Sequence, residues 1–327
     1  MKPRLLFTVG DVAGIGPEVI VKAWPQLHDF CRPVVVGDPD WMRRTLPLAK
    51  SSAKVQPIRK LTEAETTPRV IPCLPAGDQD LSDVTPGQVS AAAGRAAYDF
   101  LCAAIDLTLA RAAAGIVTAP LHKEGLRAAG VHYPGHTEIL AERTGTQRFA
   151  MLLSTEQLTV AHVTLHMALR DVFGRLSTEA VLEKIHLLDD LMPRLIGRRP
   201  RLGVAALNPH ASDGGLFGDE EERIIKPAVQ QARAAGLEVS GPWPCDTLFV
   251  RARQGEFDGV VAMYHDQGHI ALKLLGIGQL VNISAGLPIV RTSVAHGTAY
   301  DIAGQGVADE QSMVTAARAA AKLAISV

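Results

Sequence analysis

Short apolar runs alternate with longer stretches of helical periodicity along most of the chain. The short runs are rich in β-branched residues and predict buried strands at residues 5–9, 33–36, 115–118, 158–165, 202–207, 259–264 and 280–283. The longer stretches predict helices at residues 17–24, 89–113, 137–143, 178–196, 220–235 and 309–325. This alternation indicates an α/β fold with mainly parallel strands, because crossover helices of such length join parallel neighbours.

Length and composition set the class of protein. The chain has 327 residues, and a compact domain averages about 150 residues, so two domains or one large α/β domain are expected. Apolar residues make up 47% and charged residues 20%, which excludes a disordered or fibrous chain. The net charge of -1 provides no general attraction to nucleic acid or to an anionic membrane. No linker marks a domain boundary, and residues 44–86 predict irregular surface with one edge strand.

Compartment and membrane signals are both weak. The four cysteines lie far apart without a CxxC pair, which argues against a disulfide framework or a thiolate zinc site and fits a reducing cytosol. No signal peptide is evident, because the apolar run after residue 4 is too short. The most apolar long stretch, residues 91–120, carries four charges that a bilayer would disfavour. It predicts an Ala-rich helix followed by a strand.

The first strand ends in a glycine-rich loop. Gly10, Gly14 and Gly16 permit a tight turn, and Pro17 suits the first turn of a helix. The loop is not a GxGxxG fingerprint, and backbone geometry alone explains it equally well. A glycine loop by itself is therefore weak evidence for a nucleotide.

Three histidines each follow an apolar run: His166, His210 and His265. If their strands lie side by side, neutral imidazoles converge into a site for zinc or another divalent metal with an open position. Each histidine taken alone is explained more simply by a structural or surface role. His162 lies four residues from His166, a ligand spacing on a helix, but this segment predicts a strand. Nearby carboxylates that could fix the ring tautomers are Asp171, Asp213 and Asp266.

Residues suited to an anion occur in the neighbouring loops. They are His136 and Thr137 at a predicted helix start, Lys273, Asn282 and Arg291. A helix start offers free N–H groups, an arginine provides a planar fork, and a lysine provides a point charge for phosphate. Each could instead be a capping residue or a solvated charge. Their common location beside the histidine strands favours an anion site.

Six motifs, in order, resemble the 4-hydroxythreonine-4-phosphate dehydrogenase family of pyridoxal phosphate biosynthesis over nearly the whole chain. They are GDVAGIGPE at 10–18, TAPLHK at 118–123, YPGHTE at 133–138, LNPHA at 207–211, MYHDQG at 263–268 and RTS at 291–293. The resemblance implies an isocitrate/isopropylmalate-dehydrogenase-like fold of two α/β/α domains with the active site in the cleft between them. Residues 1–128 with 291–327 would form one domain, and residues 129–290 the other, with metal and dimer-interface residues. A homodimer is implied.

The resemblance also implies roles for individual residues. The metal ligands would be His166, His210 and His265, shared across the dimer and holding Zn²⁺, Mg²⁺ or Co²⁺. The substrate-binding residues would be His136, Thr137, Lys273, Asn282 and Arg291. Lys273 and Asp246 are candidates for proton transfer, with phosphate neutralisation as the plainer role of Lys273. The segment HGTAYDIAGQG at 296–306 resembles the cofactor loop of β-decarboxylating dehydrogenases, which implies NAD, or alternatively NADP, at His296, Gly297, Asp301 and Gly304.

The implied activity is metal-dependent oxidation and decarboxylation of 4-hydroxy-L-threonine 4-phosphate. The products would be 3-amino-2-oxopropyl phosphate, CO2 and NADH. Departures from the family pattern are Val12 and Ala271 in place of proline and the stretch Ser284-Ala285-Gly286. They leave open a paralogue acting on D-threonate or D-erythronate 4-phosphate. A dihydrodiol carboxylate dehydrogenase fits less well, because the phosphate-side residues are all retained.

Functions of other classes share some of these features. Three histidines with an open metal position would equally suit a metal-dependent hydrolase or an acyltransferase on a related fold. The segment 296–306 argues against a hydrolase, which has no use for an NAD loop. A non-catalytic binding module would leave the metal and anion residues without a common purpose. The sequence therefore favours a dehydrogenase.

Overall fold

A computed structural model describes residues 2–276 and 279–325, and the chain divides into two compact units. Unit 1 comprises Met1–Gln147 and Leu287–Val327, and unit 2 comprises Arg148–Gly286. Residues 129–147 and 287–290, which the sequence interpretation assigned to the second domain, lie in unit 1. The helix within residues 129–147 packs against the long helix of residues 91–109, and Arg143 donates to Asp106 at 2.6 Å.

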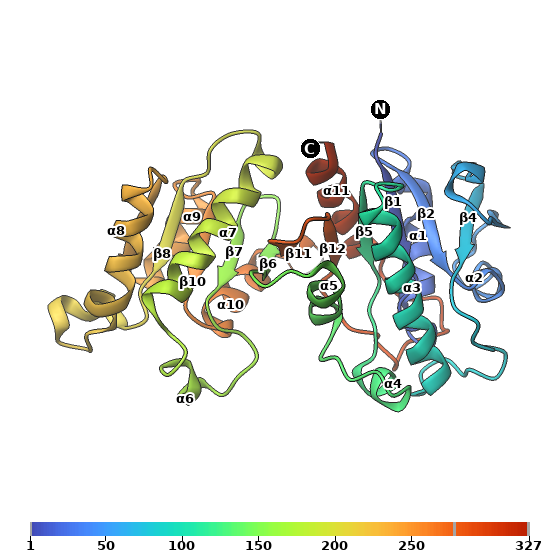
Figure 1. The fold of residues 1–327 in the computed structure, drawn as a ribbon, viewed down its shortest axis with the longest axis horizontal. Coiled ribbons are helices and arrows are strands. Elements are labelled where there is room, and N and C mark those ends of the chain that lie inside the picture. Colours follow the sequence, from blue (N-terminus) through green and yellow to red (C-terminus); the bar gives the residue numbers. More distant parts are fainter. Residues whose placement is uncertain (1, 277–278, 326–327) are drawn as a thin grey trace. The chain divides into compact units, whose positions relative to one another are not determined.

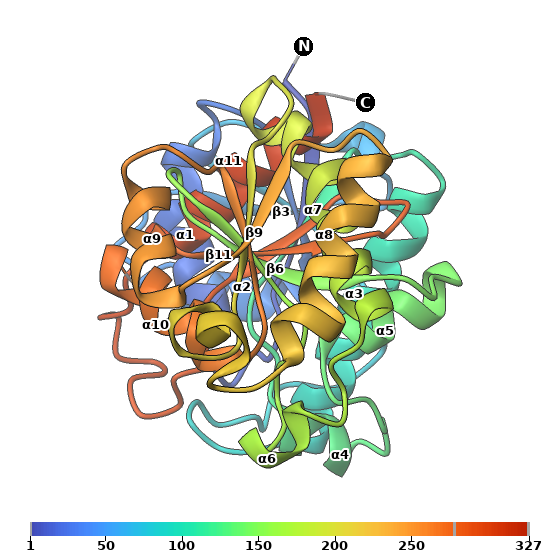
Figure 2. The ribbon, with the colours of Figure 1, turned by 90° about the vertical axis from the view of Figure 1, so that its left-hand side faces the viewer.

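Unit 1 is a parallel six-stranded sheet between helical layers (Figures 1 and 2). Its strands, in spatial order, are β3 (Lys54–Pro57), β4 (Val70–Pro75), β2 (Arg32–Gly37), β1 (Arg4–Thr8), β5 (Gly115–Thr118) and β12 (Arg291–Val294). Helices α1 (Gly16–Leu27) and α11 (Gln311–Ile325) pack together on one face, and α3 (Ala91–Leu109) covers the other. The remaining helices are α2 (Pro39–Thr45), α4 (Lys123–Ala128), α5 (His136–Thr144) and the short η1 (Leu61–Glu63). Phe7, Trp24 and Phe100 are fully buried in this core.

Unit 2 is a mixed six-stranded sheet with helices on both faces. Its strands, in spatial order, are β11 (Val281–Ala285), β6 (Ala150–Ser154), β7 (Thr159–His162), β10 (Gly259–Ala262), β8 (Leu202–Ala205) and β9 (Val239–Trp243). Strand β6 is antiparallel to β11 and β7, and the other pairs are parallel. Helices α7 (Thr178–Ile196) and α8 (Lys226–Ala234) pack on one face, and α9 (Cys245–Arg253) and α10 (His265–Leu275) on the other. Shorter segments are α6 (Leu169–Val172), η2 (Pro209–Gly215) and η3 (Glu221–Ile225).

The predicted parallel α/β architecture is confirmed, and the predicted helix of residues 178–196 coincides with α7. Three predicted strands extend too far at their carboxyl ends: β7 ends at His162, β8 at Ala205 and β10 at Ala262. In each case polar site residues begin where the chain leaves the sheet. The expectation of one edge strand within residues 44–86 is wrong, because β3 and β4 both form there.

No helix within the described ranges is long and apolar enough to cross a membrane. The cysteines Cys31, Cys73, Cys102 and Cys245 are free thiols.

Candidate active site

Three adjacent parallel strands of unit 2 carry the predicted histidines at their carboxyl ends. Strand β10 pairs in parallel with both β7 and β8, so the ends of all three face the same edge of the sheet. His166 lies in the loop after β7, and His265 is the first residue of α10, after β10. His210 lies in η2, after β8. The predicted side-by-side arrangement of these strands is therefore confirmed.

His166 and His265 lie together beside a cavity of about 340 Å³. Their ring centroids are 5.6 Å apart, and Tyr264 and Leu165 line the same cavity. The Nδ1 atom of His265 lies 2.7 Å from Oδ1 of Asp266. A carboxylate at Nδ1 fixes the ring so that Nε2 presents a lone pair, which is the usual arrangement of a metal-ligating histidine. Of the three carboxylates considered from the sequence, Asp266 makes this contact.

Two further histidines extend inward from His265. The His269 ring stacks on His265 with centroids 3.7 Å apart, and His269 Nδ1 lies 3.1 Å from Nε2 of the buried His162. Burial, reinforced by the neighbouring histidines, lowers the pKa of His162 to about 3 and that of His269 to about 4. Both rings are therefore neutral at physiological pH. Sequence reasoning missed this row, although the spacing of four between His265 and His269 in α10 signals it.

Gly268 makes room for the inner pair. A Cβ atom at this position would lie 2.3 Å from Nε2 of His162 and 2.8 Å from Cγ1 of Val160. Only a glycine therefore lets α10 approach β7 closely enough for His269 to reach His162.

His210 does not join the other predicted ligands. It is exposed in η2 and has a left-handed backbone, with φ of 53°. Among the residues that the structure describes, no three His, Cys, Asp or Glu side chains are grouped so as to hold a metal ion. One chain thus brings together His166 and His265 and leaves His210 apart.

Unit 1 contains Arg291, a buried cation predicted to bind an anion. Arg291 on β12 is only 3% exposed and donates to the Thr118 hydroxyl, at the end of β5, at 2.7 Å. Burial lowers the pKa of Arg291 to about 10, which still leaves it charged at neutral pH. His136 begins α5, and burial together with Arg291 holds the pKa of its imidazole well below the usual range. Thr137 follows in the first turn of α5. A neutral imidazole beside a buried guanidinium suits a phosphate or a carboxylate.

Unit 2 contributes the other three predicted polar residues. Lys273 is exposed in the last turn of α10, the helix that begins with His265. Asn282 is half-buried on β11, and Asp246 is exposed in the first turn of α9. Each unit therefore carries part of the predicted set, with the metal candidates confined to unit 2.

The predicted cofactor segment 296–306 is tied to the glycine-rich loop of unit 1. The Ile15 amide donates to the Thr298 carbonyl at 3.0 Å, and the Tyr300 hydroxyl donates to Oδ2 of Asp11 at 2.9 Å. The Tyr300 ring also stacks on His122, with centroids 4.4 Å apart. Burial raises the pKa of Asp11, although hydrogen bonds from Tyr300 and Ala13 oppose the rise. Sequence reasoning missed this pairing because 289 residues separate Asp11 from Tyr300.

The end of the same segment is anchored to helix α1. The Glu18 carboxylate accepts from the Gly306 amide at 3.2 Å and from the Ala308 amide at 2.7 Å. The ammonium of Lys22 donates to the Gly306 carbonyl at 2.9 Å and to the Ala308 carbonyl at 2.7 Å. These contacts hold the backbone of the segment at both ends while its middle remains accessible.

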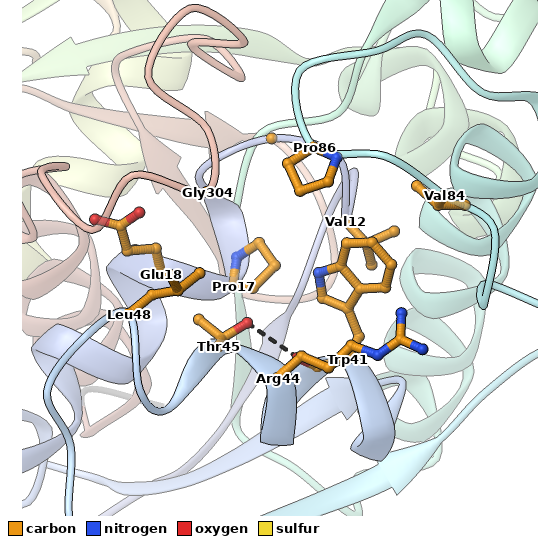
Figure 3. A pocket seen from close by; sticks show the side chains of 11 residues that line it. Val12, Pro17, Glu18, Trp41, Arg44, Thr45, Leu48, Val84, Pro86 and Gly304 are labelled. Carbon is orange, nitrogen blue, oxygen red and sulfur yellow. Dashed lines mark hydrogen bonds between the residues drawn. The ribbon is translucent and has the colours of Figure 1, made fainter.

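A second cavity, of about 140 Å³, opens beside this segment (Figure 3). Trp41, Pro86 and Gly304 lie around it, together with Val12, Pro17, Leu48 and Val84. Of the predicted cofactor residues, Gly304 lines the cavity with a left-handed φ of 77°, and Asp301 is exposed. Gly297 has open space on the side where a Cβ atom would project, and His296 directs Nδ1 to the Gly297 carbonyl at 2.9 Å.

Comparison with known proteins gives consistent matches over the full chain. A family model for pyridoxal phosphate biosynthetic protein PdxA matches residues 29–320. A 4-hydroxythreonine-4-phosphate dehydrogenase from Beijerinckia indica is 46% identical over 321 residues, covering 98% of this chain and 95% of that protein. A D-threonate 4-phosphate dehydrogenase from Cupriavidus necator is 46% identical over 327 residues, covering 98% and 97%.

Solved structures give the same picture. A crystal structure of 4-hydroxythreonine-4-phosphate dehydrogenase from Klebsiella pneumoniae matches with a TM-score of 0.91 at 45% identity. The match covers 99% of this chain and 100% of that one. The isocitrate/isopropylmalate-dehydrogenase-like α/β fold expected from the sequence is confirmed by this likeness.

Proposed function

This chain belongs to the family of pyridoxal phosphate biosynthetic protein PdxA, and we propose that it is a metal- and nicotinamide-dependent dehydrogenase of a four-carbon phosphorylated hydroxy acid. The observation that carries the proposal is the pairing of His166 with His265, oriented by Asp266, at the ends of adjacent strands. The first candidate substrate is 4-hydroxy-L-threonine 4-phosphate, oxidised and decarboxylated in pyridoxal phosphate biosynthesis. D-threonate 4-phosphate is the second candidate, because relatives named for each substrate are equally similar to this chain.

A divalent metal fits the residues present in unit 2. His166, His265 and His210 would hold it, and the carboxylate at Nδ1 of His265 leaves that ring ready to ligate through Nε2. When bound, Zn²⁺, Mg²⁺ or Co²⁺ supplies Lewis acidity at the substrate's hydroxyl and keto oxygens. Lys273 and Asp246 are the candidates for proton transfer, at Nζ and at the carboxylate oxygens respectively.

The phosphate and carboxylate of the substrate would be bound by the polar residues that the sequence predicts for an anion, and each unit is considered by itself. Arg291 presents a buried guanidinium, and Thr118 fixes one of its nitrogens. His136 and Thr137 present an imidazole and a hydroxyl at the start of α5, and Lys273 and Asn282 add a charge and an amide.

The nicotinamide cofactor would bind at the segment 296–306. When bound, it accepts the hydride that leaves the substrate's carbinol carbon. His296, Gly297, Asp301 and Gly304 are the proposed contacts, and the segment contains no Lys or Arg. Asp301 could accept from a ribose hydroxyl, which supports NAD, whereas Arg44 on the wall of the cavity beside the segment suits the 2′-phosphate of NADP, so NADP stays the alternative.

A homodimer accounts for the separation of His210 from the other two ligands. Unit 2 exposes large apolar side chains: Leu169 lines the histidine cavity and Phe173 follows it in the chain, and Leu216 and Phe217 follow the His210 turn. Exposed apolar groups of this size are typical of a protein interface. We propose that a second copy of the chain covers them and completes the metal site with its own His210.

The proposed function is tested with purified protein, each metal in turn, NAD and three phosphorylated acids. Reduced nicotinamide is expected from 4-hydroxy-L-threonine 4-phosphate, and D-threonate and D-erythronate 4-phosphates serve as competitors for the assignment. The same compounds without the phosphate are expected to react far more slowly, because Arg291 and Lys273 then have no phosphate to bind. A strong preference for D-threonate or D-erythronate 4-phosphate would replace the first candidate by that acid. Failure of all three substrates would refute the proposal.

A further inference from the structure

Five consecutive residues of η2 adopt a left-handed backbone. Their φ angles are 53° at His210, 54° at Ala211, 67° at Ser212, 46° at Asp213 and 71° at Gly214. A left-handed turn is unfavourable for any residue with a Cβ atom, and four of these five have one. The surrounding structure must therefore hold this turn in place.

Glu221 provides that hold. It is 1% exposed, and its Oε1 accepts from the Leu207 amide at 2.8 Å and from the Asn208 amide at 2.7 Å. Its Oε2 accepts from the Ser212 hydroxyl at 2.6 Å and from the Asn208 side-chain amide at 3.0 Å. One carboxylate thus joins the end of β8 to the middle of the left-handed turn.

The charge of this carboxylate is stable at physiological pH. Burial pushes the pKa of Glu221 upward, but the hydrogen bonds from Asn208 and Ser212 outweigh burial, so the pKa is lowered from its usual value. Asn208 donates in addition to Glu220 at 2.7 Å. The carboxylate of Glu221 is thus an ionised acceptor with four donors, a stronger arrangement than neutral partners would give.

The turn that Glu221 holds carries His210, whose own side chain is exposed. A ligand on a mobile loop loses conformational freedom when it binds, and a pre-ordered loop avoids much of that loss. The buried Glu221 carboxylate holds a strained backbone at a histidine, a residue type that binds metals, and this combination indicates a functional role for the turn.

We propose that Glu221 is a positioning residue that fixes the left-handed turn and thereby presents His210 to a divalent metal. The proposal rests on the proposed function, because it takes His210 as a ligand. Glu221 itself touches neither metal nor substrate. It acts through the backbone of residues 207–212, and its loss would release His210 from its ordered position.

The test compares Glu221→Gln with Glu222→Gln as the matched control. Glu222 is the next residue, is exposed and pairs with Lys226 on the surface, so its variant alters charge without touching the turn. Apo protein is titrated with Co²⁺, and the dissociation constant and bound stoichiometry are measured. Loss of a residue that orients a ligand typically weakens metal binding about 10- to 100-fold. We expect this loss for Glu221→Gln and unchanged affinity for Glu222→Gln.

A double-mutant cycle separates positioning from general stability. In a His210→Ala background, Glu221→Gln is expected to weaken Co²⁺ binding no further, whereas a purely structural effect would persist. Should Glu221→Gln fail to fold, Ser212→Ala removes only the hydroxyl that Glu221 holds and takes its place in the same cycle.

The two claims fail differently. Unchanged Co²⁺ binding by His210→Ala would overturn the proposed ligand set. Weakened binding by His210→Ala with unchanged binding by Glu221→Gln, or an undiminished Glu221→Gln effect in the His210→Ala background, would overturn the role of Glu221 alone.

Discussion

Replacing Tyr300 by phenylalanine isolates one hydrogen bond within unit 1. The variant removes the hydroxyl that donates to Asp11 at 2.9 Å and leaves the ring stacked on His122. Asp11 has no exposed surface, so water does not replace the missing donor. A hydrogen bond to a charged group contributes about 1.5–3 kcal/mol. We expect the free energy of unfolding of unit 1 to fall by about 2 kcal/mol near neutral pH.

The effect depends on pH in a direction set by Asp11. Burial raises the folded-state pKa of Asp11 above its unfolded value, so its contribution to stability is present at low pH and is lost as the pH rises through the folded pKa. The Tyr300 bond opposes this rise, and its removal raises the pKa further. The destabilisation is therefore largest at neutral pH. It should shrink to about 1 kcal/mol once Asp11 is protonated, because the lost bond is then between neutral groups.

Urea unfolding measured by tryptophan fluorescence gives the free energy, because the buried Trp24 and Trp41 report on unit 1 once Trp243, which lies in unit 2, is replaced by phenylalanine in every variant. The matched control is Tyr133→Phe, which removes a hydroxyl bonded to the exposed Glu142 in the same unit. Its expected cost is below about 1 kcal/mol, as for exposed contacts. Equal costs for the two variants, or a Tyr300→Phe cost that grows as the pH falls, would refute the reasoning.

Three further substitutions test other parts of the account. Gly268→Ala is expected to lower the free energy of unfolding by about 1–3 kcal/mol, because its Cβ overpacks against His162, and to reduce the metal content. Gly174→Ala is the control: its Cβ meets nothing closer than 3.7 Å, so the melting temperature and the metal content should stay unchanged. Arg291→Lys is expected to raise KM for the phosphorylated substrate at least about tenfold, because an ammonium lacks the planar pair of donors of a guanidinium. An unchanged KM in steady-state kinetics would contradict the anion-binding role of Arg291. Glu18→Gln is expected to weaken NADH binding, measured by fluorescence titration. The glutamine side chain would hold the backbone after residue 305 less firmly than the carboxylate does, and unaltered NADH binding would contradict the anchoring role of Glu18.

The hydrophobic pattern was sufficient to predict the elements whose buried side chains are apolar. The run of residues 115–118 and the amphipathic stretch of residues 178–196 predict β5 and α7 without error. Strand β12 escaped detection because it begins with three buried polar residues, Arg291, Thr292 and Ser293, of which the first two donate hydrogen bonds to Thr118 and Ala316. Helix α10 escaped because its first four residues, His265 to Gly268, are polar or small, so no apolar helical period marks its start.

The candidate site was predictable in outline and not in its contacts. Strand-end reasoning placed His166 and His265 at one sheet edge, since adjacent parallel strands bring their carboxyl ends together. Spacing along the chain does not show which side chains meet in the folded protein. The ring of His269 stacks on His265, and Glu221 accepts from Ser212 in the His210 turn, through such tertiary contacts. The separation of His210 from the other two candidate ligands also depends on tertiary distances.

The most direct test of the central claim is the metal dependence of cofactor reduction. Protein stripped with a chelator is assayed with NAD and either 4-hydroxy-L-threonine 4-phosphate or D-threonate 4-phosphate, before and after Co²⁺ or Zn²⁺ is restored, with His265→Ala alongside. The account predicts that reduced nicotinamide forms from at least one of these acids, disappears on stripping, returns with metal and stays absent in His265→Ala. Undiminished reduction by the stripped protein, or none with either substrate when metal is present, would contradict it.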